Sequence, residues 1–440
     1  MDIKKQDIIV CGFALFAIFF GAGNLIFPPY LGVISGNQWW LASLAFTLSD
    51  PFFPILGVIV TLSLGGKAND LGKRVHPYFA SLLSAVAILL IGPFFSVPRT
   101  GATTHEIFVQ SFFPASPQWI TSLFFFGLTA YIAINPNQVI DAIGKYLTPV
   151  LLMILAFVCG AALLNPPGPM IDPQVPNLFS FSFKEGYQTM DALGAALMAG
   201  IVISDLARRG YTDKNTQIKA GIQVGLLAFG LLAIVYIALT YAGATVSSFF
   251  TPEDNHTLIL IEMVHKILGP IGKFALGLTV ALACLTTSIG LTSICGNFFY
   301  SLFNQRISYK ILILITVTIE FTISLIGVNA IIHIAVPVLS AIYPIMMVLI
   351  LFSIFDQKIY YDATYIGAVA GAGTIGILQS INLFGQMLGH HFLQPIADWT
   401  YHLPLHQFGF EWLLPAIITS VIFTLIQAHL HSRMKKRSTS

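Results

Sequence analysis

The chain has 440 residues, of which 56% are hydrophobic and only 9% are charged. A water-soluble domain carries about 25% charged residues, so this composition excludes an ordinary soluble protein and predicts an all-α integral membrane protein that faces lipid. The net charge of +2 leaves no concentrated basic face for nucleic acid. Because no phosphate-binding loop or hydrolase motif is present, we expect neither enzymatic activity nor a cofactor nor an obligate protein partner.

The apolar residues are arranged in runs long enough to cross a membrane, which takes about 20 residues. The first run, from Ile8 to Phe27, exceeds the roughly 7–15 apolar residues of a signal peptide, so we expect it to be retained as a span. Turn residues, such as those at 135–137, separate the runs, and the polar stretch 247–273 is expected at the surface. The predicted spans lie near residues 7–34, 39–64, 77–98, 118–135, 143–164, 187–206, 217–243, 271–299, 309–327, 330–354, 360–383 and 409–431. The sequence therefore predicts one transmembrane domain, 1–440, with about twelve helices.

The positions of Lys and Arg predict the orientation, since these residues concentrate in cytoplasmic loops. With the N-terminus inside, 17 of the 21 basic residues fall inside and 4 fall outside. The four outside residues are Arg99, Lys184, Lys266 and Lys273. An odd number of spans would place the basic C-terminal tail outside, so both termini are expected in the cytoplasm.

Two of the runs contain a glycine interruption. The first contains Gly21-Ala22-Gly23-Asn24, and the sixth contains Asp191 followed by Ala192-Leu193-Gly194-Ala195-Ala196. Many secondary transporters are built from two inverted repeats whose corresponding broken helices form the binding site. The spacing fits a five-plus-five inverted repeat with broken helices 1 and 6, where free N–H groups attract a carboxylate and free carbonyls attract a cation. The alternative is that these glycines only let helices pack closely.

Polar residues in other spans are further candidates. Thr286 and Thr287 in the eighth run offer oxygen ligands for a cation, although hydroxyls in membrane helices usually bond to their own backbone. Charges inside a membrane are costly, which makes Asp50 and Asp191 candidate coupling acids, with Glu320 a weaker one. The alternatives are that Asp191 caps a half-helix, and that Arg99 pairs with Glu106 at the outer end of the third span.

The residues at the two interruptions also resemble a known family. The stretches 9–16 and 20–29, followed by 186–194 in the sixth run, closely resemble the bacterial branched-chain amino acid:cation symporter family, and so does the arrangement of spans along essentially the whole chain. This resemblance implies a leucine-transporter-like fold in the bacterial cell (inner) membrane. It also implies alternating-access import of leucine, isoleucine and valine, coupled to sodium or, in some members, to protons.

Carried over residue by residue, the resemblance implies roles for the matching positions. The amides of Gly21, Ala22, Gly23 and Asn24 hold the substrate carboxylate, and Ala192, Leu193, Gly194, Ala195 and Ala196 receive the amino group and side chain. The carbonyls of Ala17, Phe20 and Ala283 and the hydroxyls of Thr286 and Thr287 hold sodium. The repeats are expected at 7–164 and 187–354, with two additional helices at 360–431. The alternatives are proton coupling through Asp50 or Asp191, a channel, or a non-transporting sensor.

Overall fold

The computed structural model describes residues 3–134, 139–390 and 394–438, and within these ranges the regular elements are all helical. Each predicted span coincides with one helix or with a set of consecutive helices. The helices are α1 (Lys5–Phe19), α2 (Ala22–Ser35), α3 (Trp39–Thr47), α4 (Phe53–Leu64), α5 (Pro77–Leu89), α6 (Ser96–Thr104), α7 (Gln110–Phe112), α8 (Gln118–Ile134), α9 (Val139–Leu164), α10 (Leu178–Glu185), α11 (Asp191–Arg208), α12 (Lys214–Ala244), α13 (His256–Leu302), α14 (Tyr309–Ser324), α15 (Val328–Ile354), α16 (Ala363–Met387), α17 (Gln394–Thr400) and α18 (Leu413–Ser438). The expected turn at 135–137 lies outside the described residues.

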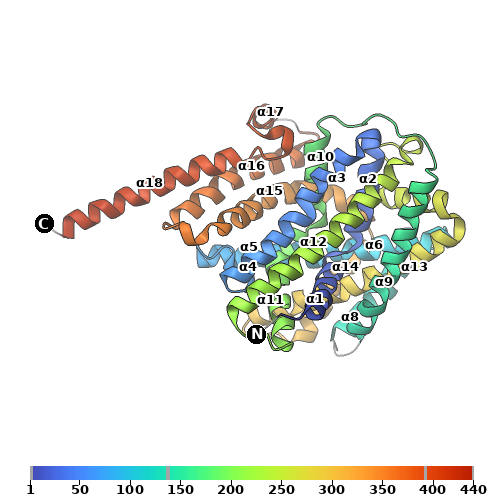
Figure 1. Ribbon diagram of the computed structural model, residues 1–440, viewed down its shortest axis with the longest axis horizontal. Helices are drawn as coiled ribbons and strands as arrows, with labels where there is room; N and C mark the ends of the chain where they lie inside the picture. Colours follow the sequence, from blue (N-terminus) through green and yellow to red (C-terminus); the bar gives the residue numbers. More distant parts are fainter. Residues whose placement is uncertain (1–2, 135–138, 391–393, 439–440) are drawn as a thin grey trace.

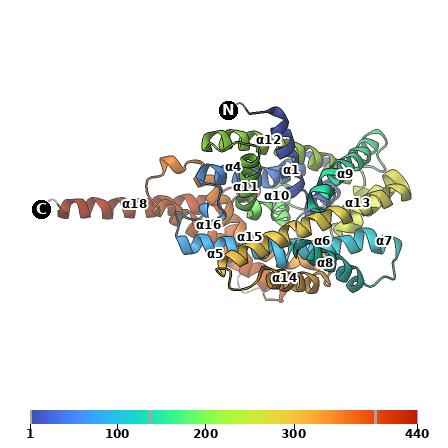
Figure 2. The same ribbon diagram turned by 90° about the horizontal axis from the view of Figure 1, so that it is seen from below.

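The helices form one bundle from which α18 projects at one end (Figures 1 and 2). Helix α2 packs along α12, α13 packs along α9, and α15, α16 and α18 lie side by side. Small residues bring some backbones into direct contact. A side chain at Gly32 would meet the Thr240 carbonyl oxygen at 2.0 Å, so only glycine permits the close approach of α2 to α12.

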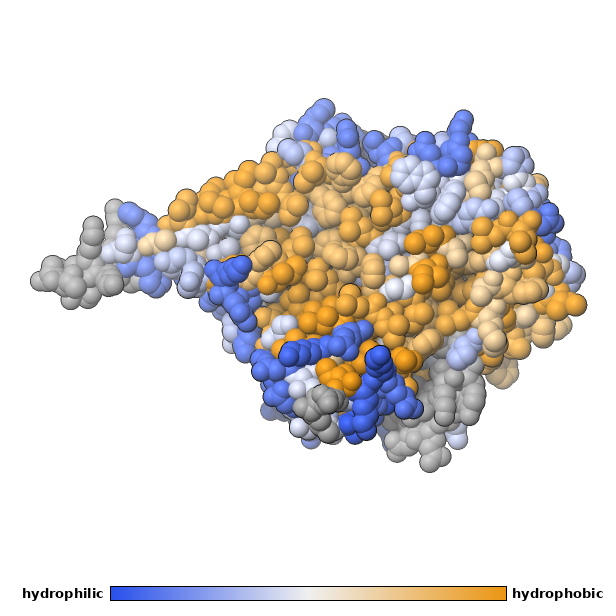
Figure 3. All heavy atoms as spheres, in the orientation of Figure 1, coloured by the Kyte–Doolittle hydropathy of each residue, from blue (hydrophilic) through white to orange (hydrophobic). Residues whose placement is uncertain are grey.

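The surface is apolar where the helices would face lipid. Figure 3 shows hydrophobic residues forming a broad band across this face, with hydrophilic residues gathered at its two edges. Seven helical segments of the described chain are long and apolar enough to cross a membrane, and the bent pair α10 and α11 makes an eighth. Segment 22–64 alone includes α2, α3 and α4. The predicted all-α membrane class is confirmed.

Three predicted spans have wrong boundaries. The third continues from Pro77 to Phe112, and the sixth starts at Leu178. The eighth belongs to α13, which begins at His256 and bends at Gly269, whose φ is +68°. The segment 256–268, expected at the surface, buries Ile259, Leu260, Met263 and Val264. These residues share one helical face, and the expectation of a surface segment followed from the polar residues around them, such as Glu253, Asp254 and Lys266.

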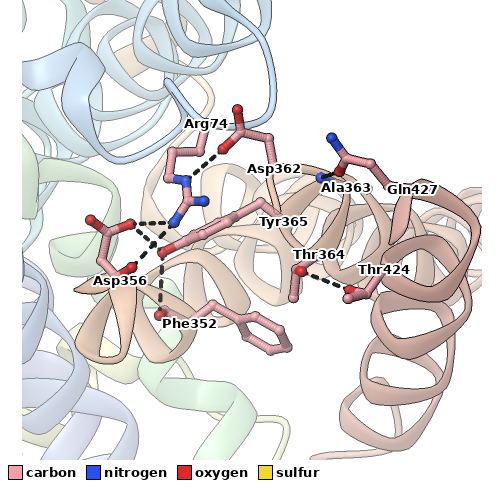
Figure 4. A network of polar contacts seen from close by, with 9 residues as sticks. All are labelled: Arg74, Phe352, Asp356, Asp362, Ala363, Thr364, Tyr365, Thr424 and Gln427. Carbon is pink, nitrogen blue, oxygen red and sulfur yellow. Dashed lines mark hydrogen bonds and ion pairs between the residues drawn. The ribbon is translucent and has the colours of Figure 1, made fainter. Parts of the chain in front are cut away.

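A polar network connects two loops (Figure 4). Arg74, between α4 and α5, donates from Nε to Asp362 Oδ1 at 2.7 Å and from Nη1 to Asp356 Oδ1 at 2.9 Å. Its guanidinium also lies 4.7 Å from the centre of the Tyr365 ring. This Arg74 network joins the α4–α5 loop to the α15–α16 loop.

Near the N-terminus, α1 is held against the end of α11. Asp7 accepts from Arg209 Nη1 at 3.1 Å and from the Tyr211 hydroxyl at 2.8 Å. One turn further along α1, the buried Cys11 thiol donates to Asp205 Oδ2 at 3.0 Å. We call these contacts the α1–α11 tie.

Glu106 joins the ends of three helical segments. Its Oε1 accepts from the Val328 N–H at 2.9 Å, and its Oε2 accepts from Asn255 Nδ2 at 3.3 Å and from the Thr257 hydroxyl. The carboxylate thus joins the end of the third span to the starts of α13 and α15. The suggested pairing of Glu106 with Arg99 is wrong, because Arg99 lies inside the bundle with different partners.

Candidate functional site

The first break separates α1 from α2 at Phe20 and Gly21. The Phe20 N–H still closes the last turn of α1 on the Phe16 carbonyl at 2.8 Å, whereas Gly21 is extended. The Gly21 N–H donates to the Asn24 side-chain oxygen at 3.2 Å. Ala22, Gly23 and Asn24 therefore form the first turn of α2, where backbone N–H groups have no partner within the helix. A break in helix 1 is therefore present where it was predicted to begin, at Gly21, whereas Ala22, Gly23 and Asn24 already belong to α2.

The second break lies earlier than the sequence suggested. The chain leaves α10 through the 3₁₀ segment η6 (Gly186–Thr189), and Met190 adopts the left-handed conformation with φ +66°. Helix α11 then begins at Asp191, and the two helices meet at 46°. The prediction that Ala192, Leu193, Gly194, Ala195 and Ala196 form the break is therefore wrong, because all five belong to regular α11.

The two breaks meet at a polar centre around Asn24. The Asn24 Nδ2 lies 2.8 Å from Asp191 Oδ2 and 3.3 Å from Asp50 Oδ2, and it also contacts the Tyr236 hydroxyl. Asp50 is fully buried at a kink between α3 and α4, where its backbone is non-helical. These contacts bring together α2, α11, α12 and the second span, so both predicted coupling acids lie at the site.

A buried arginine completes this centre. Arg99, on α6, is only 1% exposed, and its Nη1 donates to the Gln188 carbonyl at 2.7 Å. The guanidinium lies 5.3 Å from the centre of the Phe27 ring. A side chain at Gly23 would come within 2.6 Å of Arg99 Nη2. The cation thus lies directly against the first turn of α2 and the carbonyl side of η6.

A narrow central cavity of about 30 Å³ lies between the breaks. Its polar lining includes Arg99 and Asp191, and its apolar lining includes Ile18, Phe19 and Leu291. Of the predicted substrate-binding residues, the cavity brings together Gly21, Ala22, Gly23, Asn24 and Gly194.

The other four predicted residues of the sixth span do not line this cavity. Leu193 and Ala196 line a separate cavity beside α5, and Ala195 lies against α4, where it faces Gly57. Ala192 is fully buried in the first turn of α11.

The predicted sodium residues lie on α1, at the first break and on α13. The Thr286 hydroxyl donates to the Ala283 carbonyl at 2.8 Å, the backbone bond that hydroxyls in helices commonly form. The Thr287 hydroxyl lies 3.9 Å from the position of a side-chain carbon at Gly21 and lines the central cavity. Ala17 belongs to the last turns of α1, and Phe20 is the first residue after that helix.

Sequence reasoning missed Arg99, Tyr236 and Met190. Arg99 was assigned to the outside because it follows the predicted end of the third span at residue 98. The rule that intramembrane charges are functional would have found it if the span had been extended. The sequence around Tyr236 and Met190 does not mark them as functional residues, since an aromatic residue or a methionine in an apolar run usually belongs to the hydrophobic core.

Two broken helices that meet inside a bundle of membrane-spanning helices are the arrangement in which many membrane transporters form their binding site. The fold agrees with solved structures. Mhp1 in its inward-facing conformation matches with a TM-score of 0.60 and 13% identity, covering 95% of this chain and 91% of that chain. MhsT in complex with L-phenylalanine matches with a TM-score of 0.56 and 18% identity, covering 96% and 97%. The predicted leucine-transporter-like fold is confirmed.

The chain belongs to the family described as branched-chain amino acid transport protein, whose model matches residues 4–430. The branched-chain amino acid permease BraB of Bacillus subtilis (strain 168) is 37% identical over 430 residues, covering 96% of this chain and 95% of the relative. The branched-chain amino acid transport system 3 carrier protein of Pseudomonas aeruginosa is 33% identical, covering 96% and 97%. The predicted family is confirmed, and the chain is a membrane transport protein rather than an enzyme. These bacterial relatives agree with the expected location in a bacterial cell membrane.

Proposed function

We propose that this chain is a secondary active symporter that imports leucine, isoleucine and valine by alternating access. The observation that carries the proposal is that one cavity between two broken helices is lined by both a buried cation, Arg99, and an acid, Asp191. A zwitterionic amino acid presents one charge to each of these side chains. The names of the family and of the relatives supply the side-chain class.

The carboxylate side is formed by α2 and Arg99. The first turn of α2 offers backbone N–H groups at the positive end of the helix dipole. Arg99 lies against Gly23 there, and its Nε has no hydrogen-bond partner among the described residues. A guanidinium and free amides converging on one point are complementary to a carboxylate.

The ammonium side is formed by Asp191, the first residue of α11. Asp191 lines the cavity and shares the Asn24 amide with Asp50. The apolar walls leave no polar partner for the rest of the ligand. One methylene in such a pocket changes affinity by only about 1–3 kcal/mol, so we expect all three branched-chain amino acids to be accepted.

We further propose that sodium is the coupling ion and binds between the first break and α13. Freed carbonyls of broken helices coordinate sodium in transporters of this architecture. The carbonyls of Ala17, Phe20 and Ala283, together with the hydroxyls of Thr286 and Thr287, form an all-oxygen set. Support comes from Thr287 lying beside Gly21 at the first break and lining the central cavity.

Proton coupling is the second candidate, and the polar centre favours it. Asp50 and Asp191 both contact one amide nitrogen, and Asp50 Oδ1 is buried without a partner among the described residues. Two neighbouring buried carboxylates repel each other unless a positive charge or a proton lies between them. The substrate ammonium, a proton or both would meet that need.

The proposal includes the orientation. With both termini in the cytoplasm, the α1–α11 tie lies at the cytoplasmic end and the Glu106 contacts lie at the outer end. Because Arg99 lies inside the bundle, it leaves the group of four basic residues assigned to the outside. The excess of Lys and Arg on the cytoplasmic side therefore becomes larger. A reporter fused after Arg437 is expected in the cytoplasm, and an extracytoplasmic signal would overturn the orientation.

The coupling ion is tested with purified protein in proteoliposomes. Sodium and proton gradients are imposed separately, and the uptake of labelled leucine is measured. We expect accumulation with the sodium gradient alone. Accumulation driven only by the pH gradient, and abolished by Asp50→Asn or Asp191→Asn, would select proton coupling. Flux without accumulation would indicate a channel, and binding without flux would indicate a sensor.

The sodium ligands are tested with Thr286→Val and Thr287→Val. Each removes one ligand oxygen, so the sodium concentration for half-maximal uptake should rise about tenfold while expression stays constant. The matched control is Thr318→Val on α14, an exposed threonine that donates to the Leu314 carbonyl at 2.8 Å. Unchanged sodium dependence in both α13 variants would show that the ion binds elsewhere.

A further inference from the structure

A second cavity lies behind the break in helix 6 and is much larger than the central one, at about 240 Å³. It is enclosed by α10, η6, α15, α16 and α17. Its apolar walls include Phe181, Leu339 and Leu383, and its polar walls include Glu185, Gln188 and Asn382. None of these residues lines the central cavity, so the second cavity is a separate site.

Three residues that line this cavity each carry a buried acceptor atom with no hydrogen-bond partner in the described chain. These atoms are Glu185 Oε2, Gln188 Oε1 and Asn382 Oδ1. Gln188 and Asn382 are each only 3% exposed. Buried polar groups in native proteins are nearly always bonded, so three orphan acceptors around one cavity indicate a missing donor-rich group.

One of the carboxyl groups at the cavity has no basic partner in the described chain. Lys184 also lines it, but its ammonium lies 2.7 Å from Glu411 Oε1, which accepts from Gln379 Nε2 as well. Although burial would raise the pKa of Glu411, Lys184 holds that pKa below its usual range. Lys184 is thus neutralised by Glu411, whereas no ion pair in the described residues includes Glu185.

We propose that the second cavity binds the primary ammonium group of a small molecule with an apolar body. An ammonium carries three N–H donors, matching the three orphan acceptors, and its charge balances Glu185. The apolar walls bind the rest of the molecule. A free amino acid and an amine without a carboxylate share this chemistry.

The same segment, η6, forms a wall of both cavities. The Gln188 side chain lines the second cavity, while the Gln188 carbonyl accepts from Arg99 at the central site at 2.7 Å. Tyr187, beside it, stacks on Tyr343 of α15 with ring centres 4.4 Å apart. Occupancy of the second cavity therefore bears on the position of Arg99. The effect on transport rests on the proposed function, whereas the binding of an ammonium group in the second cavity does not.

Binding is tested on purified full-length protein in detergent, with 3-methylbutylamine as the probe. The amine should raise the Tm of the wild type and of the control Glu253→Gln, an exposed acid before α13. Glu185→Gln should weaken the apparent affinity about 10- to 100-fold. No Tm shift in the wild type, or an equal shift in Glu185→Gln, would overturn the proposal. Because no gradient is involved, a failure here is distinguishable from a failure of leucine import.

Equilibrium dialysis with labelled leucine distinguishes the two sources. Two leucines bound per wild-type chain, but one per Glu185→Gln chain, would identify a free amino acid as the ligand. If the wild type and Glu185→Gln each bound one leucine per chain, and the variant still lost its Tm response to the amine, the ligand would be an amine without a carboxylate. The double variant Glu185→Gln with Asn382→Asp keeps one carboxylate in the cavity and should recover amine binding. A folded double variant that recovers none would contradict the assignment.

Discussion

Replacing Gly23 by alanine tests the contact between α2 and Arg99 most directly. The new methyl carbon would lie 2.6 Å from Arg99 Nη2 and 3.3 Å from the Phe27 ring. Arg99 Nη2 must then shift, which disturbs the hydrogen bond that Nη1 of the same guanidinium donates to the Gln188 carbonyl. A hydrogen bond to a charged group contributes about 1.5–3 kcal/mol. We therefore expect kcat/KM for leucine to fall about 10- to 100-fold.

The matched control is Gly21→Ala, two residues earlier. Its methyl carbon would lie 3.7 Å from Asn24 Oδ1, an ordinary contact, and its backbone is extended. Initial rates of labelled leucine uptake are measured in proteoliposomes for both variants, and Tm is measured in detergent. Gly21→Ala should lose less uptake than Gly23→Ala. If Gly23→Ala stayed within twofold of wild type, or if both variants lost the same amount, the carboxylate role of Arg99 would be refuted.

Three further variants test the contacts that hold the bundle. In a background whose other cysteines are replaced, Asp7→Asn should loosen the α1–α11 tie and speed the alkylation of the buried Cys11 by a permeant maleimide; an unchanged rate would count against the tie. Arg74→Gln removes partly exposed ion pairs, so the free energy of unfolding should fall by only about 1 kcal/mol, measured as a lower Tm than that of the exposed control Lys73→Gln. Glu106→Gln replaces an acceptor oxygen with an NH₂ group and should raise hydrogen exchange in segment 256–268; protection equal to wild type would contradict the role of this carboxylate.

The break in helix 1 was predictable because its cause is local. Two glycines and an asparagine lie within four residues, and Asn24 folds back on the Gly21 N–H. The break in helix 6 was misplaced because its cause is tertiary. Met190 adopts a left-handed conformation that its residue type does not favour. The surrounding contacts of Gln188 with Arg99, and of Tyr187 with Tyr343, hold that segment.

The end of the third span was also misplaced because its cause is tertiary. A window average ends it before Arg99, since a charge within a membrane is costly. The helix continues because the Gln188 carbonyl and the Phe27 ring solvate the guanidinium. These partners come from α2 and η6, far away in the sequence. Composition and charge placement therefore predict the class and the spans, whereas the polar centre requires the structure.

The Asn24 amide nitrogen carries two hydrogens, but three oxygens lie around it. In the empty carrier, one of these oxygens always lacks that donor, and two of the three belong to acids. Under the proposed function, a bound ammonium offers further hydrogens to the two carboxylates, so we expect the loaded carrier to close around this centre more readily than the empty one. Amide hydrogens of α2 and α11 should accordingly exchange more slowly with leucine present than without it.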